Sequence, residues 1–243
     1  MEKRSKKTTS PEGQTRVEVI GTYILITVLF ALIGYVVIKF FMMDNVAPFV
    51  SEYDGQDYSV RKVGSPKIRQ TAADYLAKIK HKVDVLVDYM YRKGLPDPEI
   101  ASRLFKRWVS CELKETSSTE KSAAFTLNKS TEIRLCIRDK HGNFEDPNTA
   151  IFVILHELAH VMSISFGHGE EFKNNFDYIT HLASQLGIYK PENFRAFPKT
   201  YCGTEINTTP CDRGTCEFAT KSKELKDYGV NGPWAALEHF LGF

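Results

Sequence analysis

The sequence predicts an α+β domain preceded by one transmembrane helix, and three observations lead to this prediction. A run of twenty uncharged, mostly apolar residues lies near the N-terminus, at residues 19–38. Apolar residues then recur at helical spacing in several later stretches. Between these stretches, part of the chain alternates with the period of short strands. We therefore divide the chain into a polar basic tail (residues 1–16), a transmembrane helix (17–43), a linker (44–66) and one folded domain (67–243).

The composition is that of an ordinary globular chain with one sizeable core. Of the 243 residues, 42% are hydrophobic and 26% are charged. The formal net charge is only +2, whereas a protein whose main partner is nucleic acid usually has a strongly basic face. We therefore expect no nucleic-acid partner.

The apolar run near the N-terminus has the length of a membrane span. At a rise of 1.5 Å per residue, its twenty residues match a hydrocarbon core about 30 Å thick. A cleaved signal peptide is the alternative, but its apolar region is about 7–15 residues long and ends in small residues. Basic residues crowd between Lys3 and Lys7, and acidic residues follow Lys39. The positive-inside rule therefore places the N-terminus in the cytoplasm and the folded domain across the membrane, with the lipid bilayer as a partner through residues 19–38.

Three helices are predicted in the folded domain before residue 163. The first covers residues 67–93 and ends at a Gly and a Pro, and the second starts at Asp97. We interpret their apolar stripes as core. A third helix follows a Pro and can be capped by Asp146 or Asn148.

Short strands are predicted between the second and third helices. Residues 112–115 resemble one strand, and residues 124–127 and 132–138 resemble a hairpin with its turn at residues 128–130. The sequence therefore predicts a small antiparallel sheet ahead of the third helix. A short amphipathic helix is predicted at residues 233–241.

The most informative motif is HELAH at residues 156–160. On an α-helix, His156 and His160 lie on the same face, so both imidazoles can reach one metal ion. Glu157 is adjacent to the first histidine and can contact a water on that ion without becoming a ligand. This arrangement is typical of zinc hydrolases. The alternative, a core helix with incidental histidines, would bury polar side chains without partners.

A catalytic zinc takes three protein ligands and keeps one position open. The chain turns at residues 167–169, and helical spacing resumes directly afterwards. The turn can bring His168 back to the metal, and Glu171 or Glu170 is the alternative. We predict His168 as the third ligand.

These residues resemble a known family. HELAH followed by GHGEEF (residues 167–172) is similar to the WLM and SprT-like zinc metallopeptidases, whose second helix begins with a third His ahead of an aromatic residue. The segments TAADYLAKIK (71–80), AAFTLNKSTEIRLCIRD (123–139) and GIYKPENFRAFPKTYCG (187–203) resemble the WLM-like metallopeptidases of large DNA viruses and some protists. The resemblance covers roughly residues 55–215.

The resemblance implies a zincin-like fold, Zn²⁺ as the cofactor and a peptide or protein as the substrate. In that family, extended substrate adds to the edge strand beside the cleft. The strand from Ile133 to Ile137 is the candidate for this edge, and an interior strand is the alternative. Residues 189–210 resemble the segment that closes the cleft. Within it, Tyr201 is a candidate for stabilising the developing oxyanion, with a position in the core as the alternative.

The five cysteines all follow the apolar run; they are Cys111, Cys136, Cys202, Cys211 and Cys216. If that side of the membrane is oxidising, one or two disulfides are expected and at least one thiol is left over. A pair among the last three, which are close in sequence, is the simplest expectation. Glycosylation sequons at Asn128 and Asn207 are compatible with a lumenal domain.

The sequence therefore predicts a membrane-anchored zinc metallopeptidase with Glu157 as the general base. The alternative is a structural membrane or virion protein that retains the fold, with virion proteins as partners. A viral inner membrane is one candidate location.

Overall fold

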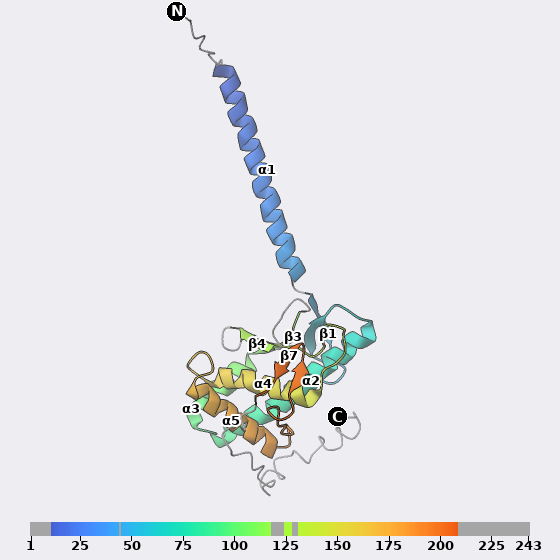
Figure 1. The fold of residues 1–243 in the computed structure, drawn as a ribbon, viewed down its shortest axis with the longest axis vertical. Helices are drawn as coiled ribbons and strands as arrows, with labels where there is room; N and C mark the ends of the chain where they lie inside the picture. Colours follow the sequence, from blue (N-terminus) through green and yellow to red (C-terminus); the bar gives the residue numbers. More distant parts are fainter. Residues whose placement is uncertain (1–10, 44, 118–123, 128–130, 209–243) are drawn as a thin grey trace, which may run out of the picture. The chain divides into compact units, whose positions relative to one another are not determined.

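The computed structural model describes residues 11–43, 45–117, 124–127 and 131–208. The chain forms two units, residues 1–44 and 45–243. In the first unit, α1 spans Pro11–Met43 (Figure 1). Its segment Val19–Ile38 has a mean hydropathy of 2.3, and none of it is buried within the unit. The predicted helix is therefore confirmed, and it is long and apolar enough to cross a membrane. An N-terminal signal sequence would show the same pattern.

The second unit begins with a hairpin of β1 (Val46–Val50) and β2 (Asp57–Arg61). The sequence analysis assigned this stretch to a linker, and that assignment was wrong. Pro48 and Gly55 are residues typical of linkers, yet Pro48 lies in a strand that pairs, among the described residues, with β2 alone, and a missing N–H is tolerated at such an edge. Alternate residues of β2 are buried, including Tyr58 and Val60, so the hairpin belongs to the domain.

Two helices follow where the sequence predicts them: α2 at Pro66–Lys93 and α3 at Pro98–Val109. The Ser65 hydroxyl accepts a hydrogen bond from the Ile68 N–H and caps α2, which ends at Gly94 with a φ of 65°. Glycine adopts this left-handed conformation without a Cβ clash. The apolar stripe of α2 is buried as predicted from its second turn onward, at Ala72, Leu76, Ile79, Val83, Leu86 and Met90, whereas Ile68 in the first turn is 40% exposed.

The three-stranded sheet contains β3 (Glu112–Glu115), β4 (Ala124–Leu127) and β5 (Glu132–Leu135), in the order β3-β5-β4. β4 and β5 pair antiparallel, as the predicted hairpin requires, but β3 pairs parallel to β5. The sheet is therefore mixed and not antiparallel as predicted. The strand proposed as the edge is the central one, and Ile133, Leu135 and Ile137 are fully buried. Within the described residues, β4 is the edge strand next to α4.

The remaining elements are α4 (Pro147–Met162), α5 (Glu170–Gln185) and a hairpin of β6 (Lys199–Tyr201) and β7 (Thr204–Ile206). α4 crosses the middle of the domain and packs on α5 and α3 (Figure 1). The Asp146 carboxylate caps α4 by accepting hydrogen bonds from the Thr149 N–H and hydroxyl, at 3.0 and 2.6 Å. Of the two predicted caps, Asp146 is therefore the one used. The helix predicted at residues 233–241 lies outside the described residues.

A buried ion cluster joins β2, β3 and the chain after β5. The Glu115 carboxylate, fully buried, accepts hydrogen bonds from Arg61 Nε at 2.7 Å and from Arg138 Nη2 at 2.6 Å. The guanidinium groups also donate to main-chain carbonyl oxygens, including those of Asp139 and Val63. One carboxylate therefore neutralises part of the charge of two buried cations, and main-chain carbonyl oxygens accept further hydrogen bonds from both guanidinium groups.

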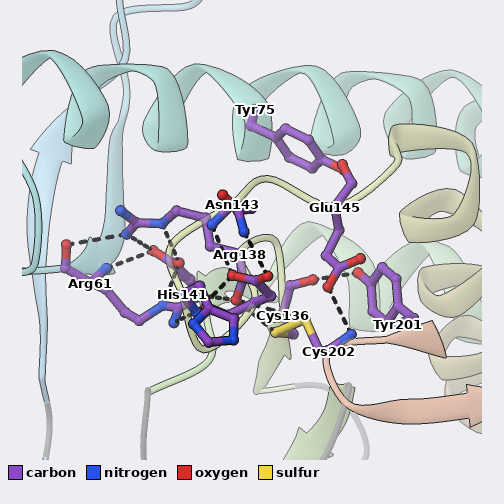
Figure 2. The surroundings of a disulfide bond; sticks show 11 residues. Arg61, Tyr75, Cys136, Arg138, His141, Asn143, Glu145, Tyr201 and Cys202 are labelled. Carbon is purple, nitrogen blue, oxygen red and sulfur yellow. Dashed lines mark hydrogen bonds and ion pairs between the residues drawn. A yellow bond between two sulfur atoms is a disulfide. The ribbon is translucent and has the colours of Figure 1, made fainter.

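Beside this cluster, a disulfide joins Cys136 to Cys202, 66 residues apart in sequence (Figure 2). The prediction of a pair among the last three cysteines was wrong, because Cys202 pairs with Cys136 instead. Cys136 is distant from Cys202 in sequence and adjacent to it only in the fold. Cys111 is a free thiol, and burial raises its pKa to about 12. Cys211 and Cys216 lie outside the described residues. The disulfide fixes the β6–β7 hairpin to the chain that leads from the sheet into α4.

Replacing Glu115 by Gln should destabilise the folded domain by about 3–5 kcal/mol, because two buried guanidinium groups lose their counter-charge. Urea unfolding of the full chain in detergent micelles measures this free energy. The matched control is Glu112→Gln on the same strand. Its side chain is 68% exposed and pairs with Lys114, so it should cost less than about 0.5 kcal/mol. Equal effects of the two substitutions would contradict the assigned role of the cluster.

Replacing Cys136 and Cys202 together by Ser should lower stability by about 2–4 kcal/mol, because the disulfide closes a loop of 66 residues. The free energy of unfolding is measured with and without reductant. Reductant should lower it in the unmodified chain and should have no such effect in the double variant. Cys111→Ser serves as the control and should leave the response to reductant intact. Peptide mapping that finds Cys136 joined to any other cysteine would rule out this pairing.

Candidate metal centre

The HELAH motif lies in the second half of α4, and three features of the sequence favour this helix. Asp146 caps its start, Pro147 occupies the first turn, and the apolar residues 150–155 are buried. His156 and His160 lie one turn apart on one side of this helix, with their ring centroids 5.0 Å apart. Both rings are partly exposed, because this side of α4 faces a cleft.

His168 lies on the turn between α4 and α5, and the turn returns its ring to the two helix histidines. Its Nε2 atom is 3.0 Å from His156 Nε2, and its ring centroid is 4.9 Å from that of His160. One ligand atom from each of the three rings lies within 4.8 Å of the others. The three predicted metal ligands therefore form a triad that could hold a metal ion.

Glu171 shapes the turn that carries His168. Its carboxylate accepts hydrogen bonds from the Ile164 N–H at 2.7 Å, the Ser165 N–H at 2.8 Å and the Ser165 hydroxyl at 2.5 Å. These bonds, the Ser165 hydroxyl first, lower the pKa of Glu171 to about 2. The backbone then reverses at Gly167, with a φ of 79°. Glu170 pairs with Lys173 on the surface. The two alternative ligands are thus engaged elsewhere, and Glu171 holds the turn.

An aromatic platform from α5 supports the triad. The ring of Phe172, which is only 3% exposed, lies 4.8, 4.3 and 4.6 Å from the rings of His156, His160 and His168, centroid to centroid. Phe176, one turn further along α5, packs against both Phe172 and His156. These contacts restrict the three imidazoles to orientations in which their nitrogen atoms converge.

The donor set fits a transition metal such as zinc. Metal ligation requires neutral imidazole, and burial, followed by the proximity of the other two rings, lowers the pKa of His156 to about 3. Two nitrogens bound tetrahedrally at about 2.0–2.1 Å lie roughly 3.3 Å apart, close to the 3.0 Å between His156 and His168. A ring-to-ring hydrogen bond alone would explain that one distance, but it would not explain the third imidazole beside it.

Glu157 points into the same cleft and is only 7% exposed. The Thr126 hydroxyl of β4 donates a hydrogen bond to Glu157 Oε2 at 2.7 Å. Burial raises the pKa of Glu157, and the bond from Thr126 opposes this shift. Sequence reasoning missed Thr126, since a threonine in a short strand carries no signal of its partner. The Thr126 bond therefore orients the carboxylate through Oε2, and no residue that the structure describes forms a hydrogen bond with Oε1.

The cleft has a volume of about 870 Å³. Its walls are residues 124–126 of β4, the HELAH motif of α4, the turn at residues 165–168, and Arg107 of α3. The edge strand, the three histidines and Glu157 therefore open into one space.

The C-terminal end of α4 is held in place by its neighbours. Arg103 and Arg107 of α3 donate hydrogen bonds to the Met162 and Val161 carbonyl oxygens, each at 2.5 Å. The Ser163 hydroxyl donates to the Ala159 carbonyl oxygen and accepts from Asn175 Nδ2 of α5. The spacing of four residues places both arginines on one face of α3, which is the signal in the sequence that they act together. These contacts fix the helix end that carries His160.

Tyr201 does not reach the cleft. Its side chain is fully buried, and its hydroxyl donates to the Cys136 carbonyl oxygen (Figure 2). Burial raises the pKa of this hydroxyl well above its usual range. The prediction that Tyr201 stabilises an oxyanion was wrong, and the alternative position in the core is correct. Tyr201 packs in the core beside the disulfide. The sequence pattern could not distinguish this position from one in the cleft.

Three viral proteins are similar in sequence. Protein R325 of Acanthamoeba polyphaga mimivirus is 31% identical over 195 residues, which cover 77% of this chain and 97% of R325. Protein 136R of Invertebrate iridescent virus 6 is 40% identical over 132 residues, or 52% of this chain and 70% of 136R. Protein 042R of Invertebrate iridescent virus 3 is 39% identical over 84 residues, or 34% of this chain and 51% of 042R. All three are described as uncharacterized.

No family model matches the chain. Among solved structures, that of Wss1 from Saccharomyces cerevisiae aligns with 49% of this chain and 80% of its own, at 20% sequence identity and a TM-score of 0.36. A match at this level has no bearing on the site described above.

The triad predicts one bound transition metal ion per chain. His156→Ala should leave the purified full chain without metal, and His168→Ala should weaken binding by at least about 100-fold, since one of three ligands is lost. Metal content by plasma mass spectrometry and competition with a chelator measure these effects. His181→Ala, an exposed histidine of α5, is the control and should retain the metal.

The same measurement on Glu171→Gln tests the alternative ligand. This variant should keep its metal, although more weakly if the turn loosens, and Glu170→Gln should be indistinguishable from the unmodified chain. Complete loss of metal in Glu171→Gln, with retention in His168→Ala, would show that the ligand assignment is wrong.

Proposed function

The chain belongs to the family of viral proteins that includes R325 of Acanthamoeba polyphaga mimivirus and 136R of Invertebrate iridescent virus 6, and we propose that it is a membrane-anchored, zinc-dependent metallopeptidase. The observation that carries this proposal is the placement of Glu157. Its carboxylate opens into the same cleft as the ligand atoms of His156, His160 and His168. An incidental histidine cluster would not require a buried carboxylate at its side.

The three histidines would hold the zinc ion through neutral imidazole nitrogens. Bound there, zinc acts as a Lewis acid toward a carbonyl oxygen and lowers the pKa of water to about 7. The packing of Phe172 against all three rings keeps the ligands in position before the metal arrives. This preorganisation supports a site with three protein ligands, in which the fourth coordination position would face the cleft.

Glu157 would act as the general base and then as the general acid. Because the Thr126 hydroxyl engages Oε2, Oε1 is the oxygen that takes the proton of the attacking water. The protonated carboxyl group then delivers that proton to the nitrogen of the departing amine. Burial raises the pKa of Glu157, although the bond from Thr126 opposes the shift, and a raised pKa favours a carboxyl group that holds the proton before it passes to the amine.

The substrate would be an extended peptide bound along β4. Within the described residues, β4 pairs only with β5, so its other edge has main-chain donors and acceptors for one more strand. Residues 124–126 also line the cleft. A peptide added to this edge would present its carbonyl group to the metal and to Glu157. The proposed edge is thus β4 and not the strand that the sequence analysis selected.

We infer that residues 19–38 anchor the chain in a membrane, with the domain on the side opposite the cytoplasm. The helix is long and apolar enough, and basic residues precede it. The Cys136–Cys202 disulfide supports the same orientation, because such bonds persist in oxidising compartments.

Glu157→Gln should retain zinc and lose peptidase activity by about 10²–10⁴-fold, because the shape is kept and the base is removed. Cleavage of an unfolded protein, followed by mass spectrometry of the products, measures the activity beside the zinc content. The control is Glu170→Gln on the surface of α5, which should cleave at the unmodified rate. Equal activity of Glu157→Gln and the unmodified chain would favour the structural role over the enzymatic one.

The domain should be protected from added protease when the full chain is inserted into sealed microsomes. Asn207 lies on the exposed surface, so glycosylation there should slow electrophoretic migration, and Asn207→Gln should abolish its contribution. Digestion of the domain from the cytoplasmic side would reverse the proposed orientation.

A further inference from the structure

Two arginines of α3 both bind the C-terminal end of α4, but their surroundings differ. Arg103 and Arg107 are one helical turn apart and cap adjacent carbonyl oxygens of α4, each at 2.5 Å. Cations at the C-terminal end of a helix interact favourably with its dipole. This capping explains why both side chains point toward α4, but it does not explain why one of them also lines the cleft.

The positive charge of Arg103 is compensated by acidic residues of the protein. It forms an ion pair with Glu99 at 3.0 Å, and its charge contributes to the lowered pKa of Glu171. The cleft lining does not include Arg103. Its role is therefore explained by contacts within the protein.

Arg107 lines the cleft and, among the residues that the structure describes, forms no ion pair with a carboxylate. The side chain is half-buried. Burial, and then the charge of Arg103, lowers the pKa of the Arg107 guanidinium. A guanidinium group has five N–H donors in a planar fork, and within the described part of the chain only Nη1 forms a hydrogen bond, to the Val161 carbonyl oxygen. The unused donors suit a carboxylate.

We propose that Arg107 is the anion-binding residue of the substrate cleft, and that it selects peptides with a carboxylate close to the bond that is cut. This proposal rests on the proposed peptidase function and specifies its substrate class. The same chemistry has two sources: the side chain of Asp or Glu, or the α-carboxylate at the end of a peptide. The first source makes the protein an endopeptidase with an acidic preference, and the second makes it an enzyme that trims C-termini.

The test uses the zinc-loaded full chain in detergent micelles. A digest of unfolded casein first identifies the bonds that are cut. Synthetic peptides around the best site then differ in one feature only, Glu against Gln at each neighbouring position, and a free C-terminus against an amide. Charged hydrogen bonds of this kind predict a preference of about 10- to 100-fold in kcat/KM for the peptide with the carboxylate. The position or terminus that gives the preference identifies the source.

Arg107→Gln should abolish the preference, and Arg107→Lys should retain part of it, because the charge remains without the fork. Arg103→Gln is the matched control: it removes a cap of the same helix end and should keep the preference for carboxylate, whatever its effect on stability. Loss of the preference in both glutamine variants would show that helix capping, and not anion binding, is responsible.

The unmodified chain already distinguishes the two proposals. Absence of cleavage, equal to that of Glu157→Gln, would reject the peptidase function and this inference with it. Cleavage at equal rates of all carboxylate and neutral peptides would reject the role of Arg107 alone.

Discussion

The structure depends on one constraint: three imidazoles from two helices and the turn between them must meet at one point. α4 supplies His156 and His160 by its helical repeat alone, but His168 reaches them only because the turn is fixed. The carboxylate of Glu171 accepts three hydrogen bonds from that turn, and Phe172, the next residue, packs against all three rings. The first turn of α5 therefore controls the geometry of the site as much as the motif does.

The rest of the domain holds α4 at both ends. At its start, Asp146 caps the helix, and the adjacent Glu145 carboxylate accepts a hydrogen bond from the Cys202 N–H beside the disulfide (Figure 2). At its end, α3 and α5 bind the last carbonyl groups and Ser163. A helix fixed in this way presents its histidines and Glu157 in one orientation, and such preorganisation is what a metal site and a catalytic carboxylate need.

The sequence predicted what depends on local periodicity and missed what depends on long-range pairing. The helical repeat and the caps were sufficient for α2, α3 and α4, and the spacing of HELAH with the following turn was sufficient to nominate His168. Strand order was not predictable, because the alternation in residues 132–135 is compatible with a central or an edge position, and only the pairing with β3 decides. The Cys136–Cys202 disulfide and the buried Tyr201 likewise join segments about 65 residues apart. Thr126 and Arg107 became visible only when β4 and α3 were placed beside α4.

The most direct measurement of the central claim is X-ray absorption at the zinc edge of the full chain, with zinc bound. The account predicts three imidazole nitrogens at about 2.0–2.1 Å, one further light ligand, and no sulfur at about 2.3 Å. Replacement of His168 should reduce the imidazole scattering from three rings to two. A spectrum with sulfur ligands, or with two imidazoles in the unmodified chain, would contradict the convergence of His156, His160 and His168 on one metal ion.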